Sequence, residues 1–281
     1  MRFSLFPQFG AMNSKPVFEA FEHSLRKAGH MVEYDSMHAD VAVIWSVLFH
    51  GRMAANKPIW DYYTKTGKKV IVLEVGGIKR GTTWKVGLNG INRDGYFGNT
   101  GASGDRATAL EINLKQWKDE GEYILICGQH DKSLQWQNMP RMSHWIMNII
   151  DEVQRYCDKP IVFRPHPRCR LDHIERQYKN VYRDDPIKLD NTYDDYNLSF
   201  KDCHAVISWS SNPGPQAILA GVPVFCGPSS LAYDVGNKDI STIKYPLKPN
   251  RKQWLNDYAW TEFTIEEIAN GIPLKRLTSR L

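Results

Sequence analysis

The chain has 281 residues, of which 42% are hydrophobic and 24% charged, so it can bury a core as one large domain or as two small ones. That composition excludes a disordered chain, and five cysteines without CxxC spacing indicate neither a disulfide framework nor a zinc site. The formal net charge of +5 favours an anionic partner, such as a nucleotide, a nucleic acid or a membrane surface, without choosing among them.

The start of the chain, MRFSLFPQFG, contains no apolar run of signal-peptide length. No later segment approaches the roughly 18 apolar residues that would cross a bilayer. We therefore expect a soluble protein without a transmembrane segment, in a reducing cytoplasm.

Over the first 75 residues, short apolar runs alternate with longer amphipathic runs, which is the βαβ rhythm of a parallel sheet. Gly29 and Gly67 stand where a helix should stop before the next strand. The predicted strands are 3–6, 31–34, 41–47 and 70–75, and the predicted helices are 17–28 and 59–66.

The pattern breaks at residues 76–106, which are rich in Gly, Asn, Thr and aromatic residues and predict one long irregular loop. A loop of this length in a compact domain is usually functional or mobile. A helix predicted at 107–118 leads to Gly121, and we place a domain boundary near 118–122.

A second β/α rhythm begins at residue 123. Two doubly wound halves facing each other would leave a cleft at the carboxyl ends of both sheets, where ligands bind in such folds. The expected division is 1–120, 121–262, and a final segment 263–281 whose helix packs back on the hinge. Strands are predicted at 123–127, 161–164, 205–208 and 222–226, and helices at 143–156, 193–200 and 215–220.

The element Arg164-Pro165-His166-Pro167 follows a predicted strand directly. Arg164 and His166 can both donate hydrogen bonds to a phosphate, and the prolines stiffen the turn that carries the imidazole. The alternative is that a histidine between two prolines only ends a strand and closes a turn.

A second polar segment, SWSSNPG at 208–214, follows the strand 205–208 and opens a helix. Hydroxyls and free backbone N–H groups at such a position bind anions, and glycine allows a ligand to approach the backbone. Taken alone, the segment is equally well an N-cap with a turn. Its candidate ligand residues are Ser208, Ser210, Ser211, Asn212 and Gly214.

A third loop, Gly128 to Ser133, follows the strand 123–127 and contributes Gln129 and Asp131. Three loops with phosphate- and sugar-binding side chains would then meet at one edge of one sheet. Their convergence is what favours a ligand site over three unrelated turns.

The run ILICGQHDKSLQW, the RPHP element and the segment SWSSNPGPQAILAGVPVFCGPSSLAYDVG, in this order, resemble the donor-binding half of capsule-polysaccharide glycosyltransferases of the Kdo-transferase-like group. The same His-Pro and Ser-Ser pair is found in bacterial sialyltransferases of the GT-B type. The resemblance covers residues 123–240. It implies a GT-B-like α/β fold of two Rossmann-like domains, with the acceptor bound by 1–120 and the nucleotide sugar by 121–262.

By this resemblance, His166 would contact the donor phosphate and assist the leaving group, while Ser210 and Ser211 would hold the phosphates. Gln129 and Asp131 would lie near the nucleotide or the sugar. The resemblance implies no metal and no cofactor other than a UDP- or CMP-linked sugar as co-substrate.

An inverting transfer needs a general base that takes the proton of the acceptor hydroxyl. Arg93-Asp94-Gly95 resembles the acidic-Gly motif that carries this base in those sialyltransferases, although the first acidic residue is missing. Asp94 is the first candidate and Glu74, at the end of the strand 70–75, is the second. RDG is also a common turn sequence, and a retaining mechanism would need no such base.

Basic and aromatic side chains alternate in the loop 76–106, a profile typical of nucleic-acid contacts. It slightly favours a phage-type enzyme in the host cytoplasm that glycosylates a flipped hydroxymethylated pyrimidine in double-stranded DNA. The alternatives are a glycan or glycolipid acceptor in surface-polysaccharide synthesis, and a non-catalytic nucleotide- or glycan-binding module. The candidate acceptor-binding residues are Lys79, Arg80, Trp84, Lys85, Arg93 and Tyr96.

Overall fold

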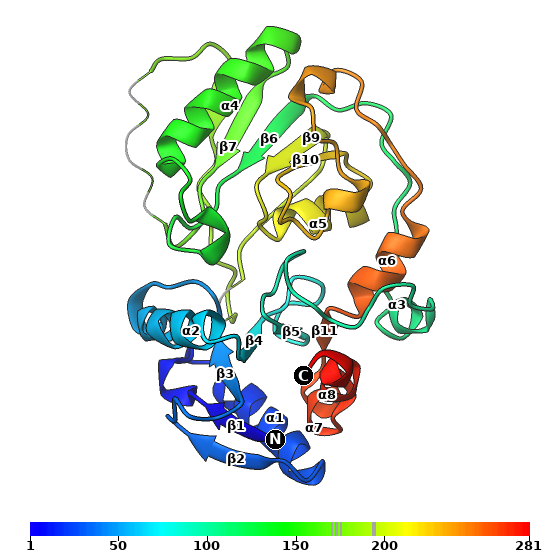
Figure 1. Cartoon of the computed structure of the whole chain (residues 1–281). Helices are drawn as coiled ribbons and strands as arrows, with labels where there is room; N and C mark the ends of the chain where they lie inside the picture. Colours follow the sequence, from blue (N-terminus) through cyan, green and yellow to red (C-terminus); the bar gives the residue numbers. More distant parts are fainter. Residues whose placement is uncertain (170, 172–173, 175, 193–194) are drawn as a thin grey trace. The chain divides into compact units, whose positions relative to one another are not determined.

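The computed structural model describes residues 1–169, 171, 174, 176–192 and 195–281 (Figure 1). The chain forms two compact units. Unit 1 comprises Met1–Leu110 and Asn256–Leu281, and unit 2 comprises Glu111–Leu255. Unit 1 therefore contains both ends of the chain. No helix in the described part of the chain is long and apolar enough to cross a membrane.

Unit 1 is built on a six-stranded sheet with the order β11-β5-β4-β3-β1-β2. β1 to β4 are mutually parallel, whereas β5 runs antiparallel to β4, and β11 runs antiparallel to β5. The strands are β1 (Arg2–Leu5), β2 (Met31–Tyr34), β3 (Val41–Trp45), β4 (Lys69–Val75), β5 (Trp84–Leu88) and β11 (Glu262–Phe263).

Helices cover both faces of this sheet, so its central strands read as continuous apolar runs, as in the fully buried VAVIW of β3. The apolar face of α1 packs with Ile71 and Leu73 of β4, and α7 and α8 join the same core. α2 contacts β3 and β4. The helices are α1 (Lys15–Lys27), α2 (Asn56–Lys65), α3 (Asp105–Ala109), α7 (Ile265–Ala269) and α8 (Ile272–Leu277), with α6 (Lys252–Ala259) crossing the division between the units.

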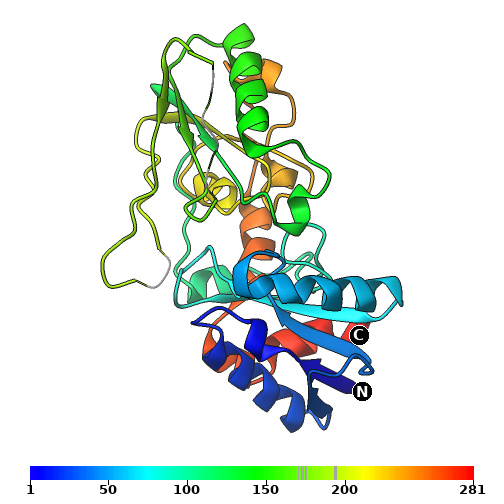
Figure 2. The ribbon, with the colours of Figure 1, turned by 90° about the vertical axis from the view of Figure 1, so that its left-hand side faces the viewer.

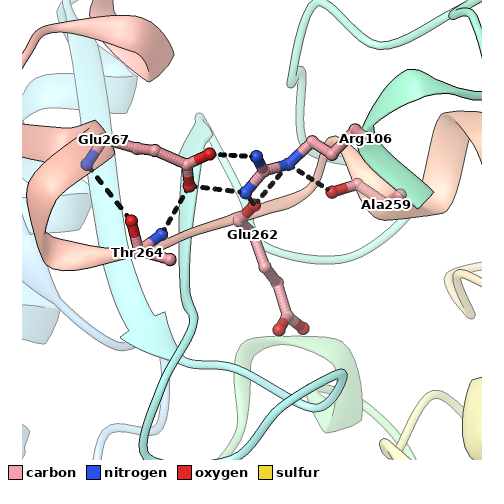
Figure 3. Close-up of polar contacts among 5 residues, drawn as sticks. All are labelled: Arg106, Ala259, Glu262, Thr264 and Glu267. Atoms are coloured by element: carbon pink, nitrogen blue, oxygen red, sulfur yellow. Dashed lines mark hydrogen bonds and ion pairs between the residues drawn. The ribbon is translucent and has the colours of Figure 1, made fainter. Parts of the chain in front are cut away.

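One buried arginine fixes the C-terminal segment to unit 1 (Figure 3). Arg106, 4% exposed, donates to the carbonyl of Ala259 at 2.9 Å and to that of Glu262 at 3.1 Å, and pairs with the Glu267 carboxylate. Glu267 also completes a capping box with Thr264 at the start of α7. Inside unit 1, α7 packs on α1, and α8 packs on α7 and β5. The packing on the hinge expected for 263–281 stays a prediction.

Unit 2 is built on five parallel strands with the order β10-β9-β6-β7-β8. The first strand, β6, is central and the chain extends the sheet on both sides of it, as in a doubly wound fold. Figure 2 shows α4 in green along one face of this sheet, where Ile146 and Ile150 pack on Ile124 and Ile126. The elements are β6 (Tyr123–Cys127), α4 (Met142–Tyr156), β7 (Ile161–Arg164), β8 (Val181–Arg183), β9 (Cys203–Ser208), α5 (Pro213–Leu219) and β10 (Val224–Cys226).

The helix predicted at 107–118 is wrong beyond Ala109. Glu111 has a φ of 52°, which ends the helix, and the following segment is irregular. The N–H groups of Lys115 and Lys118 donate to carbonyls of Leu219 and Gly221 in unit 2, at 2.9 and 2.8 Å. These bonds join the segment to unit 2, which begins at Glu111, whereas the expected boundary was near 118–122.

Two further segments differ from their predicted structure. The segment 76–106 is not one irregular loop, because it contains β5, whose Trp84 and Val86 belong to the core of unit 1. The helix predicted at 193–200 is absent from its described residues 195–200, where Tyr196 instead makes an antiparallel bridge with Lys188. Tyr193 and Asp194 lie outside the described residues.

Candidate functional site

Three polar loops leave neighbouring strand ends in unit 2. β9, β6 and β7 are adjacent and parallel, and their last residues are in register, with Cys127 opposite both Arg164 and Ser208. The loops that follow these strands therefore start side by side at the carboxyl edge of the sheet, as predicted. This edge is where ligands bind in doubly wound folds.

Gln129 ties two of these loops together. Its side chain is 6% exposed, and its Oε1 accepts hydrogen bonds from the Ser210 N–H at 3.1 Å and the Ser210 hydroxyl at 2.8 Å. Its Nε2 donates to the Ser133 hydroxyl at 2.7 Å. Gln129 therefore holds Ser210 in place, which is a different task from the direct ligand contact expected for it.

His166 is partly exposed, and its Nδ1 accepts a hydrogen bond from the Arg168 N–H at 3.1 Å. The proton of the neutral ring then resides on Nε2, so the ring is a donor at that atom. The turn between the prolines thus sets a tautomer with a hydrogen-bond donor at Nε2.

His130 was not predicted as a site residue from the sequence, yet it repeats this geometry. Its Nδ1 accepts the N–H of Lys132 at 3.2 Å, and its ring meets that of His166 edge-on at a centroid distance of 5.4 Å. His130 is only 4% exposed. The available signal was its position, since each histidine stands two or three residues after the end of one of two paired strands.

The serine segment brings buried hydroxyls to the same edge. The hydroxyls of Ser208 and Ser211 are buried and have no hydrogen-bond partner among the described residues. A Cβ added at Gly214 would lie 2.9 Å from the Ser208 hydroxyl, so any larger residue there would displace that hydroxyl. Asn212 directly precedes α5. Because an unsatisfied buried hydroxyl costs about 1–3 kcal/mol, these two are candidates for bonds to a bound molecule.

Arg164 does not fit the phosphate-binding role predicted for it. Its guanidinium is 6% exposed and is bonded to the Asp184 carboxylate and to Asn197, the latter through Oδ1 at 2.9 Å. It therefore anchors the segment that follows β8. The prediction failed because a strand-end arginine can serve a neighbouring loop as well as a ligand.

Asp131 lies on the exposed side of its loop. Its Oδ1 is 3.3 Å from Nδ1 of His130, and its Oδ2 is 3.8 Å from Nζ of Lys132. Cys169 is close to the same carboxylate, and burial raises the pKa of the Cys169 thiol. Asp131 thus takes part in a side-chain cluster with groups from the loop after β7.

In unit 1, three charged residues lie opposite one another across adjacent strands. Glu74 on β4 faces Lys85 on β5, which faces Glu262 on β11. Burial lowers the pKa of Lys85, and the two carboxylates act against that change. Glu74 is the partly exposed member of this row and lies at the carboxyl end of β4.

Glu262 is fully buried and holds the turn between β4 and β5. Its carboxylate accepts the N–H groups of Gly77 and Ile78 at 2.6 and 3.0 Å and the hydroxyl of Thr83 at 2.7 Å. No sequence pattern identified this residue, because its partners are far away along the chain.

Asp94, the first candidate for a base, lies at the opposite edge of the sheet. Its turn follows β5, and the N–H of Asn89 donates to the carbonyl of Val70 at 2.7 Å, near the amino end of β4. Val70 and Glu74 are about 13 Å apart along the strand at about 3.3 Å per residue. Since ligands bind at carboxyl edges, this placement favours Glu74 over Asp94.

The six predicted acceptor-binding residues do not form one surface. Trp84 and Lys85 are buried in the sheet, at 5% and 2% exposure. Tyr96 lies in the turn after β5 and bonds Ser279 at 3.0 Å through its hydroxyl. They divide as Lys79 and Arg80 before β5, Trp84 and Lys85 within it, and Arg93 and Tyr96 after it. The composition of the loop was therefore a poor guide to which of its residues share one exposed surface.

No protein-family model matches this chain, and no curated protein matches it. The solved structure of KpsC from Thermosulfurimonas dismutans, a beta Kdo 2,4 transferase, is similar over 97% of this chain and 98% of that chain, with a TM-score of 0.51 and 11% identity. The beta Kdo 2,7 transferase of KpsC from the same organism covers 98% of this chain and 100% of that chain, with a TM-score of 0.48 and 13% identity. The first likeness confirms the predicted α/β fold of the GT-B type, with two Rossmann-like units.

Proposed function

We propose that this chain is a glycosyltransferase that moves a sugar from a nucleotide-sugar donor to an acceptor hydroxyl. The observation that carries the proposal is the carboxyl edge of the sheet in unit 2. There, Gln129 fixes Ser210, the His166 ring is a donor at Nε2, and the Ser208 and Ser211 hydroxyls are buried without partners among the described residues. The fold shared with a solved transferase supports it.

The proposed site matches the charge that develops in such a transfer. The bond between the sugar and the phosphate oxygen breaks, the acceptor oxygen bonds to the sugar, and the nucleotide leaves with added negative charge. Nε2–H of His166 would donate to that phosphate, and the serine hydroxyls would stabilise its other oxygens. Because these donors belong to the protein, the proposed step does not call on a metal.

Glu74 is the proposed general base for an inverting transfer. It is partly exposed at the carboxyl edge of the sheet in unit 1, and one of its oxygens, Oε1, accepts the N–H of Val75 at 2.7 Å. The other oxygen would take the proton of the acceptor hydroxyl. A retaining transfer would leave Glu74 without this task.

For the acceptor, we propose a glycan or glycolipid of the cell surface. The basic and aromatic residues that favoured DNA are divided between the turns at the two ends of β5 and the core. The solved protein of similar fold is a Kdo transferase, which fits a glycan acceptor better. Hydroxymethylated DNA is the alternative acceptor, and a non-catalytic binding module is the alternative of another class.

The test combines a panel of UDP- and CMP-sugars with two acceptor sets, surface oligosaccharides and DNA with hydroxymethylated pyrimidines, and reads sugar-sized mass gains by mass spectrometry. Gain on an oligosaccharide supports the proposal, and gain on modified DNA alone would replace the acceptor. Donor binding without transfer or hydrolysis would indicate a binding module.

The variant His166→Ala should abolish transfer while the fold, measured by circular dichroism, stays intact. His144→Ala, which removes an exposed histidine of α4, is the matched control and should transfer like the wild type. Full turnover by His166→Ala would remove the basis of the proposal.

A further inference from the structure

Three possible metal ligands meet at the loops that follow β6 and β7. His130 and Asp131 come from the first loop and Cys169 from the second, and their ligand atoms all lie within 4.8 Å of one another. The N–H of Cys169 donates to the carbonyl of His166 at 3.0 Å, which fixes the turn that carries the thiol. His130 is buried, so its ring is held in place by the surrounding packing.

The chemistry of this set selects among metals. An imidazole, a carboxylate and a thiolate suit Zn²⁺, whereas Mg²⁺ and Ca²⁺ prefer oxygen ligands only. Zinc bonds of about 2.0–2.3 Å place tetrahedral ligand atoms about 3–4 Å apart, so small side-chain movements would close this cluster. One carboxylate and one thiolate would also balance the two charges of the ion.

We propose that His130, Asp131 and Cys169 form a zinc-binding site at the carboxyl edge of the sheet in unit 2. The ion would join the loop after β6 to the loop after β7, with water as its fourth ligand. This site is distinct from the transfer proposed above, because none of its three ligands has a task in that step.

One nearby cation competes for the same carboxylate. Nζ of Lys132 lies 3.8 Å from Oδ2 of Asp131, but the Lys132 side chain is 60% exposed and can turn into water. The Asp131 oxygen nearer to His130 is Oδ1, at 3.3 Å from Nδ1. Zinc bound at Nδ1 would replace the hydrogen bond that this atom accepts from the Lys132 N–H, because the nitrogen has a single lone pair in the ring plane.

The experiment uses the whole chain, reduced with a phosphine and stripped of metal by a chelator. Zinc is then titrated, and the metal bound per chain is measured by mass spectrometry after gel filtration. Cadmium replaces zinc in a parallel titration, because a cadmium-thiolate bond produces an ultraviolet charge-transfer band. The proposal expects one metal per chain and this band.

Cys169→Ser should abolish the charge-transfer band and weaken zinc binding by roughly tenfold or more. Cys226→Ser, which changes another partly exposed cysteine, is the matched control and should bind like the wild type. Asp131→Asn keeps the shape of an exposed side chain, so it should fold normally and still weaken binding. Zinc should raise the melting temperature of the wild type more than that of Asp131→Asn.

Two results would overturn the site. One is a wild-type chain that binds no zinc. The other is a Cys169→Ser variant that binds zinc and cadmium as the wild type does, which would assign the metal to other residues. Because transfer activity is not the readout, failure here leaves the proposed function standing, and the reverse is also true.

Discussion

Both sheets are built around adjacent parallel strands, but they differ at their carboxyl edges. In unit 2, side chains connect three loops from adjacent strands: Gln129 accepts from the Ser210 hydroxyl, and the ring of His130 meets that of His166 edge-on. In unit 1, the charged residues near the edge hold the sheet itself, since Glu262 is fully buried and binds the turn after β4. Polar residues placed directly after strands therefore predicted loops that start side by side, whereas the composition of a long loop did not predict which of its residues are exposed.

The largest expected effect is on the rate of transfer, and it distinguishes Glu74 at the carboxyl edge of the sheet in unit 1 from Asp94 at the amino edge. Glu74→Gln should lower the rate of transfer by about 10²-fold or more, because the proposed base is lost. Asp94→Asn should leave the rate within about twofold of the wild type. Steady-state rates with saturating donor measure both. A loss confined to Asp94→Asn would restore the first candidate and place the acceptor at the amino edge.

The next effect concerns the stability of unit 1. Glu262→Gln removes a fully buried carboxylate that raises the pKa of Lys85 by its charge and that accepts hydrogen bonds from Gly77, Ile78 and Thr83. Leaving a buried charge uncompensated typically costs about 3–5 kcal/mol, and we expect a loss of folding stability in this range. Urea unfolding measures it, with Glu266→Gln, an exposed residue of α7, as the control. Equal stability of the two variants would show that the buried row is not a stabilising element.

A smaller effect is expected from removing the hydrogen bonds that Gln129 makes in unit 2. Gln129→Ala removes the hydrogen-bond partner of Ser210 and Ser133. This change should lower the free energy of unfolding by about 1–3 kcal/mol and weaken the binding of the donor. Gln137→Ala, at an exposed position close in sequence, should change neither. Unaltered donor affinity in Gln129→Ala would mean that Ser210 does not depend on this bond for its position.

The smallest effect depends on pH. Burial lowers the pKa of His204 below its ordinary value of 6.5, while its Nε2 contacts the Ile243 carbonyl at 2.8 Å. The unfolded chain then binds a proton at His204 more readily than the folded chain does. The free energy of unfolding therefore keeps the contribution of His204 above pH 6.5 and loses it as the pH drops below 6.5. His204→Gln should reduce this loss between pH 7 and pH 5 in urea unfolding. Parallel curves for the two proteins would contradict the assignment to His204.

Much of the fold could be predicted because apolar periodicity marks buried strands, as in β3, β4, β6 and β7. The helix at 107–118 was mispredicted because good helix formers such as Ala and Leu outweighed a left-handed Glu111 and bonds to distant carbonyls. β5 was missed because glycine and threonine flank an otherwise regular alternation of Trp84, Val86 and Leu88. Local propensity cannot register contacts made by the far end of the chain.

The sequence was enough to predict which loops form the candidate site, but not which hydrogen bonds their side chains make. His166 and the serines follow strand ends, which sequence shows, whereas the internal use of Arg164 depends on Asp184 and Asn197. His130 was overlooked because a single histidine beside Gln129 carries no spacing rule. Its relation to His166 exists only once β6 and β7 are paired.

The central claim is that the donor binds at the carboxyl edge of the sheet in unit 2. Isothermal titration of the preferred nucleotide sugar into wild type, His166→Ala, Ser211→Ala and His144→Ala tests it most directly. The account predicts that the first two variants bind at least about tenfold more weakly, with His144→Ala unchanged. Wild-type affinity in both His166→Ala and Ser211→Ala would contradict it and move the donor away from this edge.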